Sequence, residues 1–293
     1  MQPGNSRPPV VRIFIGPYGL RSGWRLTLFL LLSAVIAMVP QYFARRSPFG
    51  VWSLGVLAAT WIMARLDHQP FTSYGLGVVD RGRNLLAGLA AGFVALSLLI
   101  GLLVATRAFD PRGPDLHGVA IARWALYWVA VFTFTALGEE LLMRGYGLFA
   151  LSQGIGFWPA AVVLSLLFGA GHIGNRGEEI IGIANAVLAG MLFAFSVWWS
   201  GTLWWAIGCH LTWDWAETFF YGVPNSGGPV VSTHFLTGSP AGPTWLSGGS
   251  VGPEGSVLAT VVLLLLAAAV RYTTARHAVA GLERRLGHSR LTA

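Results

Sequence analysis

The sequence has few charged residues, a single cysteine and no lysine. Charged side chains make up 11% of its 293 residues, whereas soluble domains contain about a quarter. Together with 54% hydrophobic residues, this shortage excludes an ordinary soluble globule. The apolar content also excludes a disordered chain, because so many apolar residues offset the entropy lost on ordering. Since Cys209 is the only cysteine, an intrachain disulfide and a cysteine-rich metal site are excluded.

Several common functional motifs are also missing. The sequence contains no nucleotide-binding P-loop, no GxSxG esterase elbow and no HExxH zinc-protease motif. Its 19 basic residues are all arginine and give a formal net charge of +7, but they lie between apolar runs and form no contiguous basic face. We therefore expect no nucleic-acid partner and expect anionic lipid headgroups to contact the arginines.

Long apolar runs are abundant, and the mean hydropathy is +0.62. Because about 20 apolar residues cross a bilayer as a helix, the sequence predicts eight spans, at 26–43, 49–64, 85–104, 117–137, 156–171, 180–200, 202–220 and 256–270. The predicted fold is all-α, a polytopic membrane bundle of about eight transmembrane helices. No small-x-small cleavage site follows the first span, so we expect it to be retained.

The distribution of arginine predicts orientation and domain organisation. Most arginines fall in inner segments if the N-terminus is cytoplasmic, so the positive-inside rule places both termini in the cytoplasm. Four arginines in the predicted outer loops oppose this orientation, namely Arg45, Arg46, Arg107 and Arg112. The predicted division is a basic N-terminal segment at 1–25, one transmembrane domain at 26–270 and a basic cytoplasmic tail at 271–293. Within that domain, a loop at 221–255 rich in Gly, Ser and Pro is either a set of ordered turns or a flexible lid.

A small set of ionisable residues interrupts the apolar runs, where a charge costs at least ~2.5 kcal/mol. The set is Glu139, Glu140, Arg144, His172, His210, Asp214 and Glu217. Glu140 precedes Arg144 by four residues on one helix face, which makes it the predicted structural partner. Glu139 faces another direction and has no local cation, so it is the candidate for accepting a proton from water. The alternative is that both glutamates pair with arginines in a structural network.

His172 lies one helical turn after Phe168, with small residues between them that allow another helix to approach closely. If the fourth span continues to about Leu151 before the chain turns, Glu139 and His172 lie at similar depth and the hairpin brings them together. A histidine at the membrane interface is the alternative interpretation.

The seventh span carries His210 and Asp214 four residues apart, on one helix face and ~6 Å apart along the axis. The pair could hold a metal, orient each other, donate hydrogen bonds to an oxyanion or simply hold helices together. In the sixth span we expect Asn185 to bridge helices, as intramembrane asparagines commonly do.

Taken in order, three motifs resemble those of the CAAX protease and bacteriocin-processing (CPBP) family of intramembrane glutamic endopeptidases, which includes the type II CAAX prenyl proteases. The motifs are EExxxR from Glu139 to Arg144, FxxxH from Phe168 to His172, and HxxxD from His210 to Asp214, where the family has HxxxN or HxxxD. The resemblance covers roughly residues 115–220. It implies a multi-pass protein of the bacterial cell (inner) membrane.

The resemblance also implies roles for individual residues. Glu139 and His172 would activate a water for attack on a peptide carbonyl, and His210 and Asp214 would stabilise the oxyanion. The implied supporting residues are Glu140, Arg144, Phe168 and Asn185, and no metal or other cofactor is required. An ionised aspartate offers only acceptors, so Asp214 is either protonated or holds His210 as the donor.

The implied substrate is a membrane-anchored or lipidated protein or peptide within the lipid bilayer. Two alternatives remain at this point. The first is a zinc-dependent membrane protease with Glu139, His172 and His210 as ligands. The second is a membrane transporter or bacteriocin-immunity protein without catalysis, in which the buried ionisable residues relay protons.

Overall fold

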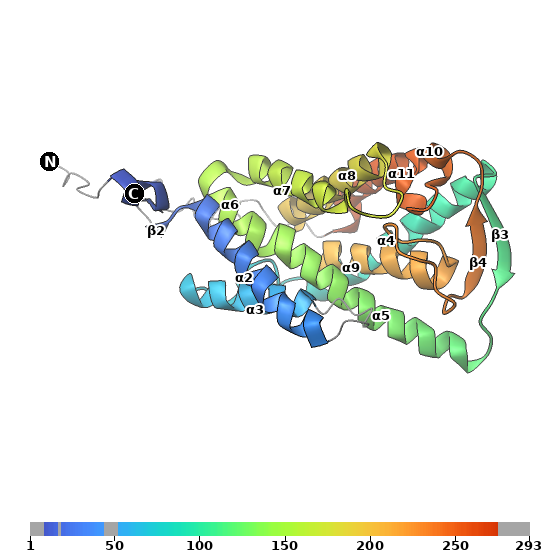
Figure 1. The fold of residues 1–293 in the computed structure, drawn as a ribbon, viewed down its shortest axis with the longest axis horizontal. Helices are drawn as coiled ribbons and strands as arrows, with labels where there is room; N and C mark the ends of the chain where they lie inside the picture. The colour runs from blue at the N-terminus through green and yellow to red at the C-terminus, as the bar shows by residue number, and fades with distance from the viewer. Residues whose placement is uncertain (1–8, 17–18, 44–51, 275–293) are drawn as a thin grey trace.

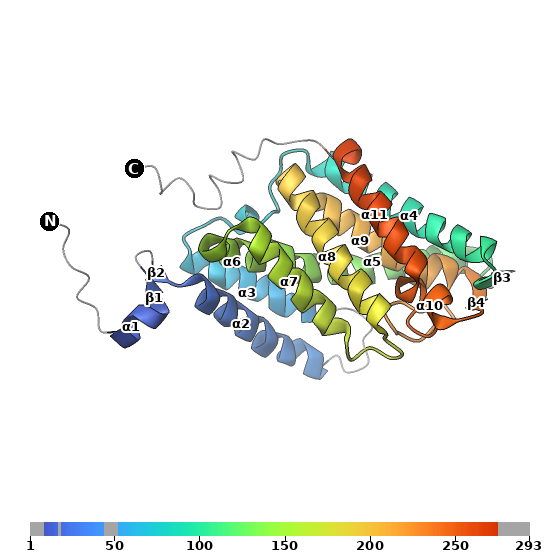
Figure 2. The same ribbon diagram turned by 90° about the horizontal axis from the view of Figure 1, so that it is seen from above.

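The structure is a computed structural model that describes residues 9–16, 19–43 and 52–274. Its long helices form an elongated bundle (Figures 1 and 2). They are α2 (Ser22–Phe43), α3 (Trp52–Leu66), α4 (Arg81–Ala105), α5 (Val119–Glu140), α7 (Phe157–His172), α8 (Ile180–Ser200), α9 (Trp204–Trp215) and α11 (Val257–Thr273). The start of the predicted second span and most of the 271–293 tail lie outside the described residues, as does part of the 1–25 segment.

Each predicted span coincides with one of these helices, with ends displaced by a few residues. Four helical stretches are long and apolar enough to cross a membrane, namely Ser22–Val39, Arg81–Ala105, Val119–Ile155 and Ile180–Ser200. The helices α3, α7 and α11 are apolar but shorter. Large apolar side chains remain exposed on the outer faces, for example Leu126 and Leu166, as expected of helices surrounded by lipid. The protein is therefore an all-α, multi-pass membrane bundle.

Shorter elements complete the chain. Near the N-terminus, α1 (Pro9–Phe14) precedes a two-stranded ribbon of β1 (Ile15–Gly16) and β2 (Gly19–Leu20). A single 3-10 turn, η1 (Phe71–Ser73), lies between α3 and α4. Such short elements are not evident from apolar periodicity, which is why the sequence did not predict the ribbon.

The fourth span does not end at Glu140. It passes into a π-helical segment, η2 (Leu141–Tyr146), and then into α6 (Gly147–Ile155), with a kink at Gly145, whose φ and ψ are −85° and −108°. The expected continuation to about Leu151 is therefore confirmed, although it extends to Ile155 and is not one regular helix. A second π-helical segment, η3 (Ala216–Tyr221), extends α9.

Helices α4 and α9 pack at very short range because glycine lines the contact. A Cβ added at Gly88 would lie 2.2 Å from the carbonyl oxygen of Trp205, and one at Gly92 would lie 2.2 Å from that of Cys209. Small residues spaced by four commonly allow such backbone contact between membrane helices. The contact places α9, and with it His210, inside the bundle.

The segment at 221–255 contains short secondary-structure elements joined by turns. Its strand β4 (Leu236–Pro240) pairs antiparallel with β3 (Phe109–Pro114), with an irregularity between Pro111 and Gly113. The helix α10 (Thr244–Ser247) and the 3-10 turn η4 (Pro253–Gly255) follow, before α11 begins. Figure 1 shows the β3–β4 ribbon at the end of the bundle opposite to β2.

Candidate active site

A cavity of about 350 Å³ lies among the C-terminal helices of the bundle. All four predicted catalytic residues line it: Glu139 from α5, His172 from α7, and His210 and Asp214 from α9. Asn185 from α8 lines it as well, and apolar side chains of α8 and α11 form other parts of its wall. Three stretches that are far apart in the sequence therefore converge on one pocket with both polar and apolar surfaces.

Glu140 anchors the polar side of this pocket from behind. Its Oε1 accepts a hydrogen bond from Arg144 Nη1 at 3.1 Å and lies 3.0 Å from His210 Nδ1. Glu140 is fully buried and Arg144 is nearly so. The guanidinium of Arg144 also lies over the ring of Phe168, 4.4 Å from its centroid. Thus the structure brings together Glu140, Arg144 and Phe168, which link helices α5 and α7 to the His210 ring.

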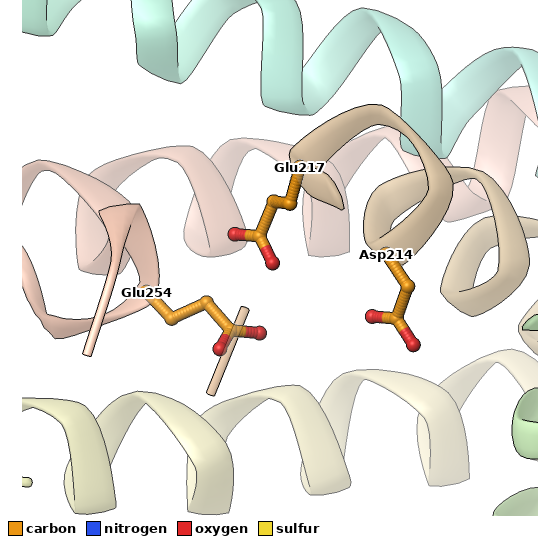
Figure 3. A group of neighbouring side chains, drawn as sticks. All are labelled: Asp214, Glu217 and Glu254. Atoms are coloured by element: carbon orange, nitrogen blue, oxygen red, sulfur yellow. The ribbon is translucent and has the colours of Figure 1, made fainter. Parts of the chain in front are cut away.

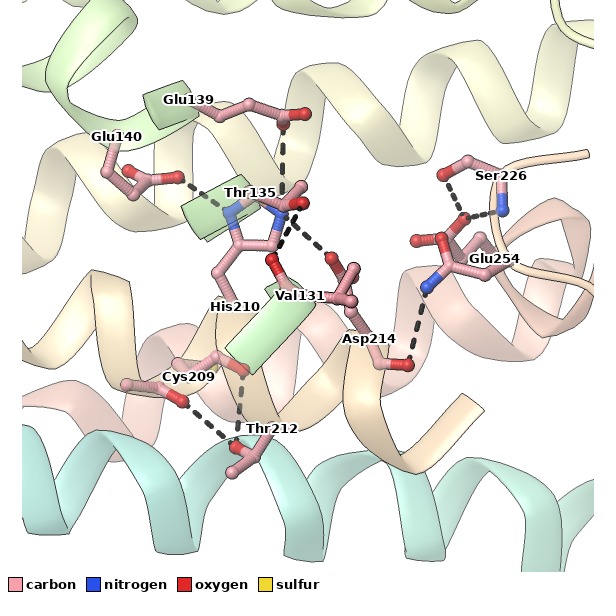
Figure 4. A network of polar contacts seen from close by, with 12 residues as sticks. Val131, Thr135, Glu139, Glu140, Cys209, His210, Thr212, Asp214, Ser226 and Glu254 are labelled. Atoms are coloured by element: carbon pink, nitrogen blue, oxygen red, sulfur yellow. Dashed lines mark hydrogen bonds and ion pairs between the residues drawn. The ribbon is translucent and has the colours of Figure 1, made fainter. Parts of the chain in front are cut away.

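The orientation of His210 follows from its contact with Glu140. A carboxylate oxygen only accepts, so Nδ1 carries the proton that is donated to Glu140. The other ring nitrogen, Nε2, lies 3.7 Å from Glu139 Oε2 and 3.6 Å from Asp214 Oδ2 (Figure 4). Phe193 stacks on the ring, with centroids 5.6 Å apart. Hence Nε2 faces the cavity between two carboxylates, and neither comes within ordinary hydrogen-bond distance.

His172 is held by its own helix. Its Nδ1 lies 2.8 Å from the carbonyl oxygen of Phe168, an acceptor, so Nδ1 carries a proton and Nε2 is free to accept one when the ring is neutral. The Phe168 ring packs against the imidazole with a centroid distance of 4.8 Å. In the part of the chain that the structure describes, no direct hydrogen bond or ion pair joins His172 to Glu139. Both side chains instead border the same cavity.

Asn185 connects α8 to the segment that precedes α11. Its Nδ2 donates to the carbonyl oxygens of Glu254 at 2.7 Å and Ser256 at 2.9 Å. Its Oδ1 accepts from the hydroxyl of Thr260 at 2.6 Å. Asn185 therefore supports one wall of the cavity and lies at its edge.

Sequence reasoning missed the cavity residues that come from loops. Glu178 lies between α7 and α8, and Asn225, Ser226 and Glu254 lie in the 221–255 segment. Ser226 donates to Glu254 Oε2 from both its backbone nitrogen, at 2.9 Å, and its hydroxyl, at 2.6 Å. Burial raises the pKa of Glu178, which also lies near the Glu254 carboxylate. One signal was available, because Glu254 is the only acidic residue of 221–255.

The three residues proposed as zinc ligands line the cavity but do not form a compact donor set. Among the described residues, one group of acidic, histidine or cysteine side chains has its donor atoms within 4.8 Å of one another, and it consists of Asp214, Glu217 and Glu254. That group contains neither Glu139, His172 nor His210.

Comparison with known proteins finds one family model that matches the segment containing this site. Residues 121–216 match the family model described as type II CAAX prenyl endopeptidase Rce1-like. No curated protein and no solved structure matches the chain. The matched range includes all three motifs, from Glu139 to Asp214, and the helices α5 to α9 that carry them. Residues 121–216 of this multi-pass membrane protein are therefore similar to the Rce1-like CAAX protease family.

Proposed function

We propose that the protein is an intramembrane endopeptidase of the glutamate type, which cleaves a membrane-anchored or lipidated protein or peptide. The observation that carries this proposal is the convergence of Glu139, His172, His210 and Asp214 on one cavity of about 350 Å³. Hydrolysis beside a bilayer requires a polar pocket that holds water, and these side chains supply its polar groups.

In the proposed first step, a water lies between Glu139 and the Nε2 atom of His172. Glu139 takes the proton of this water as it attacks the peptide carbonyl, and His172 accepts the second hydrogen bond of the water. Two features support these roles. Glu139 keeps about a quarter of its side chain exposed to the cavity, at 26%, and the contact of His172 Nδ1 with Phe168 leaves Nε2 as the acceptor.

The oxyanion is proposed to bind at His210 Nε2. Three carboxylates surround this ring, and we propose that it carries a proton on both nitrogens. Because Nε2 lies more than 3.5 Å from both Glu139 and Asp214, its proton is available to a substrate oxygen. In this proposal Asp214 acts as a positioning residue that keeps the imidazolium aimed at the cavity, which is a role that an aspartate can fill as an acceptor.

The buried Glu140–Arg144 pair is proposed to hold this arrangement in place. Glu140 fixes the tautomer and direction of His210, while Arg144 offsets the charge of Glu140. A metal takes no part in the proposed steps. In bacteria, the proposed location is the inner membrane with both termini in the cytoplasm.

Comparative peptidomics tests the proposal. Membrane fractions from cells that produce the wild-type protein or Glu139→Gln would be compared for peptides with new termini. We expect a defined set of cleaved membrane-associated proteins that depends on Glu139, with equal amounts of both proteins in the membrane. Identical peptide sets, or a change in proton-coupled transport without any cleavage, would reject protease activity in favour of the transporter alternative.

A further inference from the structure

At the wall of the cavity, three carboxylates approach one another. Asp214 and Glu217 come from α9 and its π-helical extension η3, and Glu254 comes from η4 (Figure 3). One carboxylate oxygen of each lies within 4.8 Å of the others. Among the described residues, the only ion pair of this group joins Asp214 to His210, at 3.6 Å.

Glu217 is the most unusual member of this group. Its side chain is fully buried, and within the described part of the chain neither of its carboxylate oxygens has a hydrogen-bond partner. The side chain of Trp213 approaches it without ordinary hydrogen-bond geometry. Figure 3 shows the Glu217 carboxylate pointing toward those of Glu254 and Asp214. Ionising a buried carboxylate that has no partner is strongly unfavourable, so this arrangement requires a positive ligand or protons.

Glu254 differs from Glu217 because hydrogen bonds hold its carboxylate. The two hydrogen bonds from Ser226 both end on Oε2, and Oε1 accepts no hydrogen bond from the residues that the structure describes. The backbone carbonyl of Glu254 is held by Asn185. The carboxylate is therefore positioned by its neighbours before any ligand binds, and it belongs to a different segment from Asp214 and Glu217.

We propose that Asp214, Glu217 and Glu254 bind one divalent cation of the calcium type, beside the proposed catalytic residues. Oxygen-only donors favour hard cations over zinc, which prefers nitrogen and sulfur. Calcium binds oxygen at about 2.3–2.6 Å, so ligands on opposite sides of the ion lie about 4.6–5.2 Å apart, whereas the corresponding span for magnesium is about 4.0–4.2 Å. The three donor oxygens lie within 4.8 Å of one another, so all three can reach one calcium ion. Magnesium demands near-ideal octahedral geometry and gives up its waters reluctantly, so an all-protein carboxylate site suits it less.

Such an ion would connect the 221–255 segment to the helix that carries His210, because Glu254 belongs to the former and Asp214 to the latter. It would also balance part of the negative charge of the three carboxylates. This inference goes beyond the proposed protease function and does not depend on it, since cation binding is measurable without a substrate.

Direct binding to the purified full chain in detergent tests the site. Titration with calcium alone, followed by calorimetry and by thermal unfolding, should show about one calcium bound per chain and a higher unfolding temperature. Magnesium should bind more weakly. Glu217→Gln and Glu254→Gln should each weaken calcium binding at least about tenfold, because even groups one step removed from a metal typically contribute that much.

Glu178→Gln is the matched control, because Glu178 lines the same cavity but lies outside the group. It should retain calcium binding close to the wild-type level. The proposal is overturned if the wild-type chain binds no calcium, which would mean that protons neutralise the carboxylates. It is equally overturned if both Glu217→Gln and Glu254→Gln bind calcium as tightly as the wild type.

Discussion

Glu140 Oε1 is shared between Arg144, 3.1 Å away on the same helix face, and His210, 3.0 Å away on α9. One carboxylate oxygen thus joins the EExxxR motif to the HxxxD motif. The second oxygen of Glu140 and Nη2 of Arg144 are buried without hydrogen-bond partners among the described residues. The pair is consequently sensitive to the loss of either member, because few other groups can replace it.

Arg144→Ala should destabilise the protein strongly. Removing one partner of a buried ion pair typically costs about 3–5 kcal/mol, because the other charge remains buried. Thermal unfolding in detergent, monitored by the fluorescence of buried tryptophans, measures the effect. The double variant Glu140→Gln with Arg144→Met leaves no charge behind and should recover part of the loss. If Arg144→Ala unfolds like the wild type, the pair does not support the fold.

Replacing Glu139 should reduce cleavage in graded fashion. Glu139→Gln removes the proton acceptor and should lower kcat by ~10²–10⁴-fold, the usual contribution of general base catalysis. Glu139→Asp keeps a carboxylate but withdraws it by one methylene, so its kcat should lie between that of Glu139→Gln and that of the wild type. The assay uses the substrate that membrane peptidomics identifies. Glu179→Gln, at an exposed glutamate outside the cavity lining, is the control. If Glu139→Gln is as active as Glu139→Asp, Glu139 does not act as a base.

Gly92→Ala should disturb the site through helix packing alone. Its new methyl group would lie 2.2 Å from the carbonyl oxygen of Cys209, so α4 and α9 must move apart. Overpacking of this kind typically costs about 1–3 kcal/mol, and the neighbouring His210 would move with α9. Unfolding temperature and cleavage rate should both fall. Gly101→Ala provides the control on the same helix, because a Cβ there meets nothing within 4 Å; equal behaviour of the two variants would show that the close contact is unimportant.

Asn185→Ala should loosen the turn before α11. The substitution removes the donors that hold the carbonyl oxygens of Glu254 and Ser256. Loss of a buried hydrogen-bond partner costs about 1–3 kcal/mol. Amide hydrogen exchange across 248–256 should therefore become about 5- to 140-fold faster, since each ~1.4 kcal/mol corresponds to a factor of ten. Asn175→Ala, which changes another asparagine of the cavity lining, should leave exchange in this segment unaltered.

Much of the fold could be predicted because lipid imposes a simple rule. A segment that crosses a bilayer must be a long apolar helix, so the 180–200 span was predicted with its observed bounds and the other spans differ only at their ends. The pairing of Glu140 with Arg144 followed from helical periodicity. These features depend on local sequence, which is why one chain suffices to predict them.

The remaining features depend on contacts between distant segments. Neither helical periodicity nor hydropathy places Glu254 beside Glu217, since a turn rich in Gly, Ser and Pro lies between them in the sequence. The contact between His210 and Glu139 was also not predicted, because it depends on how α5 and α9 are rotated about their axes. That rotation is set by close packing such as the contact of Gly92 with Cys209.

Converting the π-helical segment η2, Leu141–Tyr146, into regular α-helix would disrupt the packing on its C-terminal side. Removing one residue to restore ordinary α-helical winding would rotate every later position by about 100° relative to Glu140. Arg144 and Tyr146, both buried, would then face new surroundings. The irregular winding thus joins two helical registers. The first directs Glu139 and Glu140 toward α9, and the second packs α6 against its neighbours. A shortened, regular helix would preserve only one of these two arrangements.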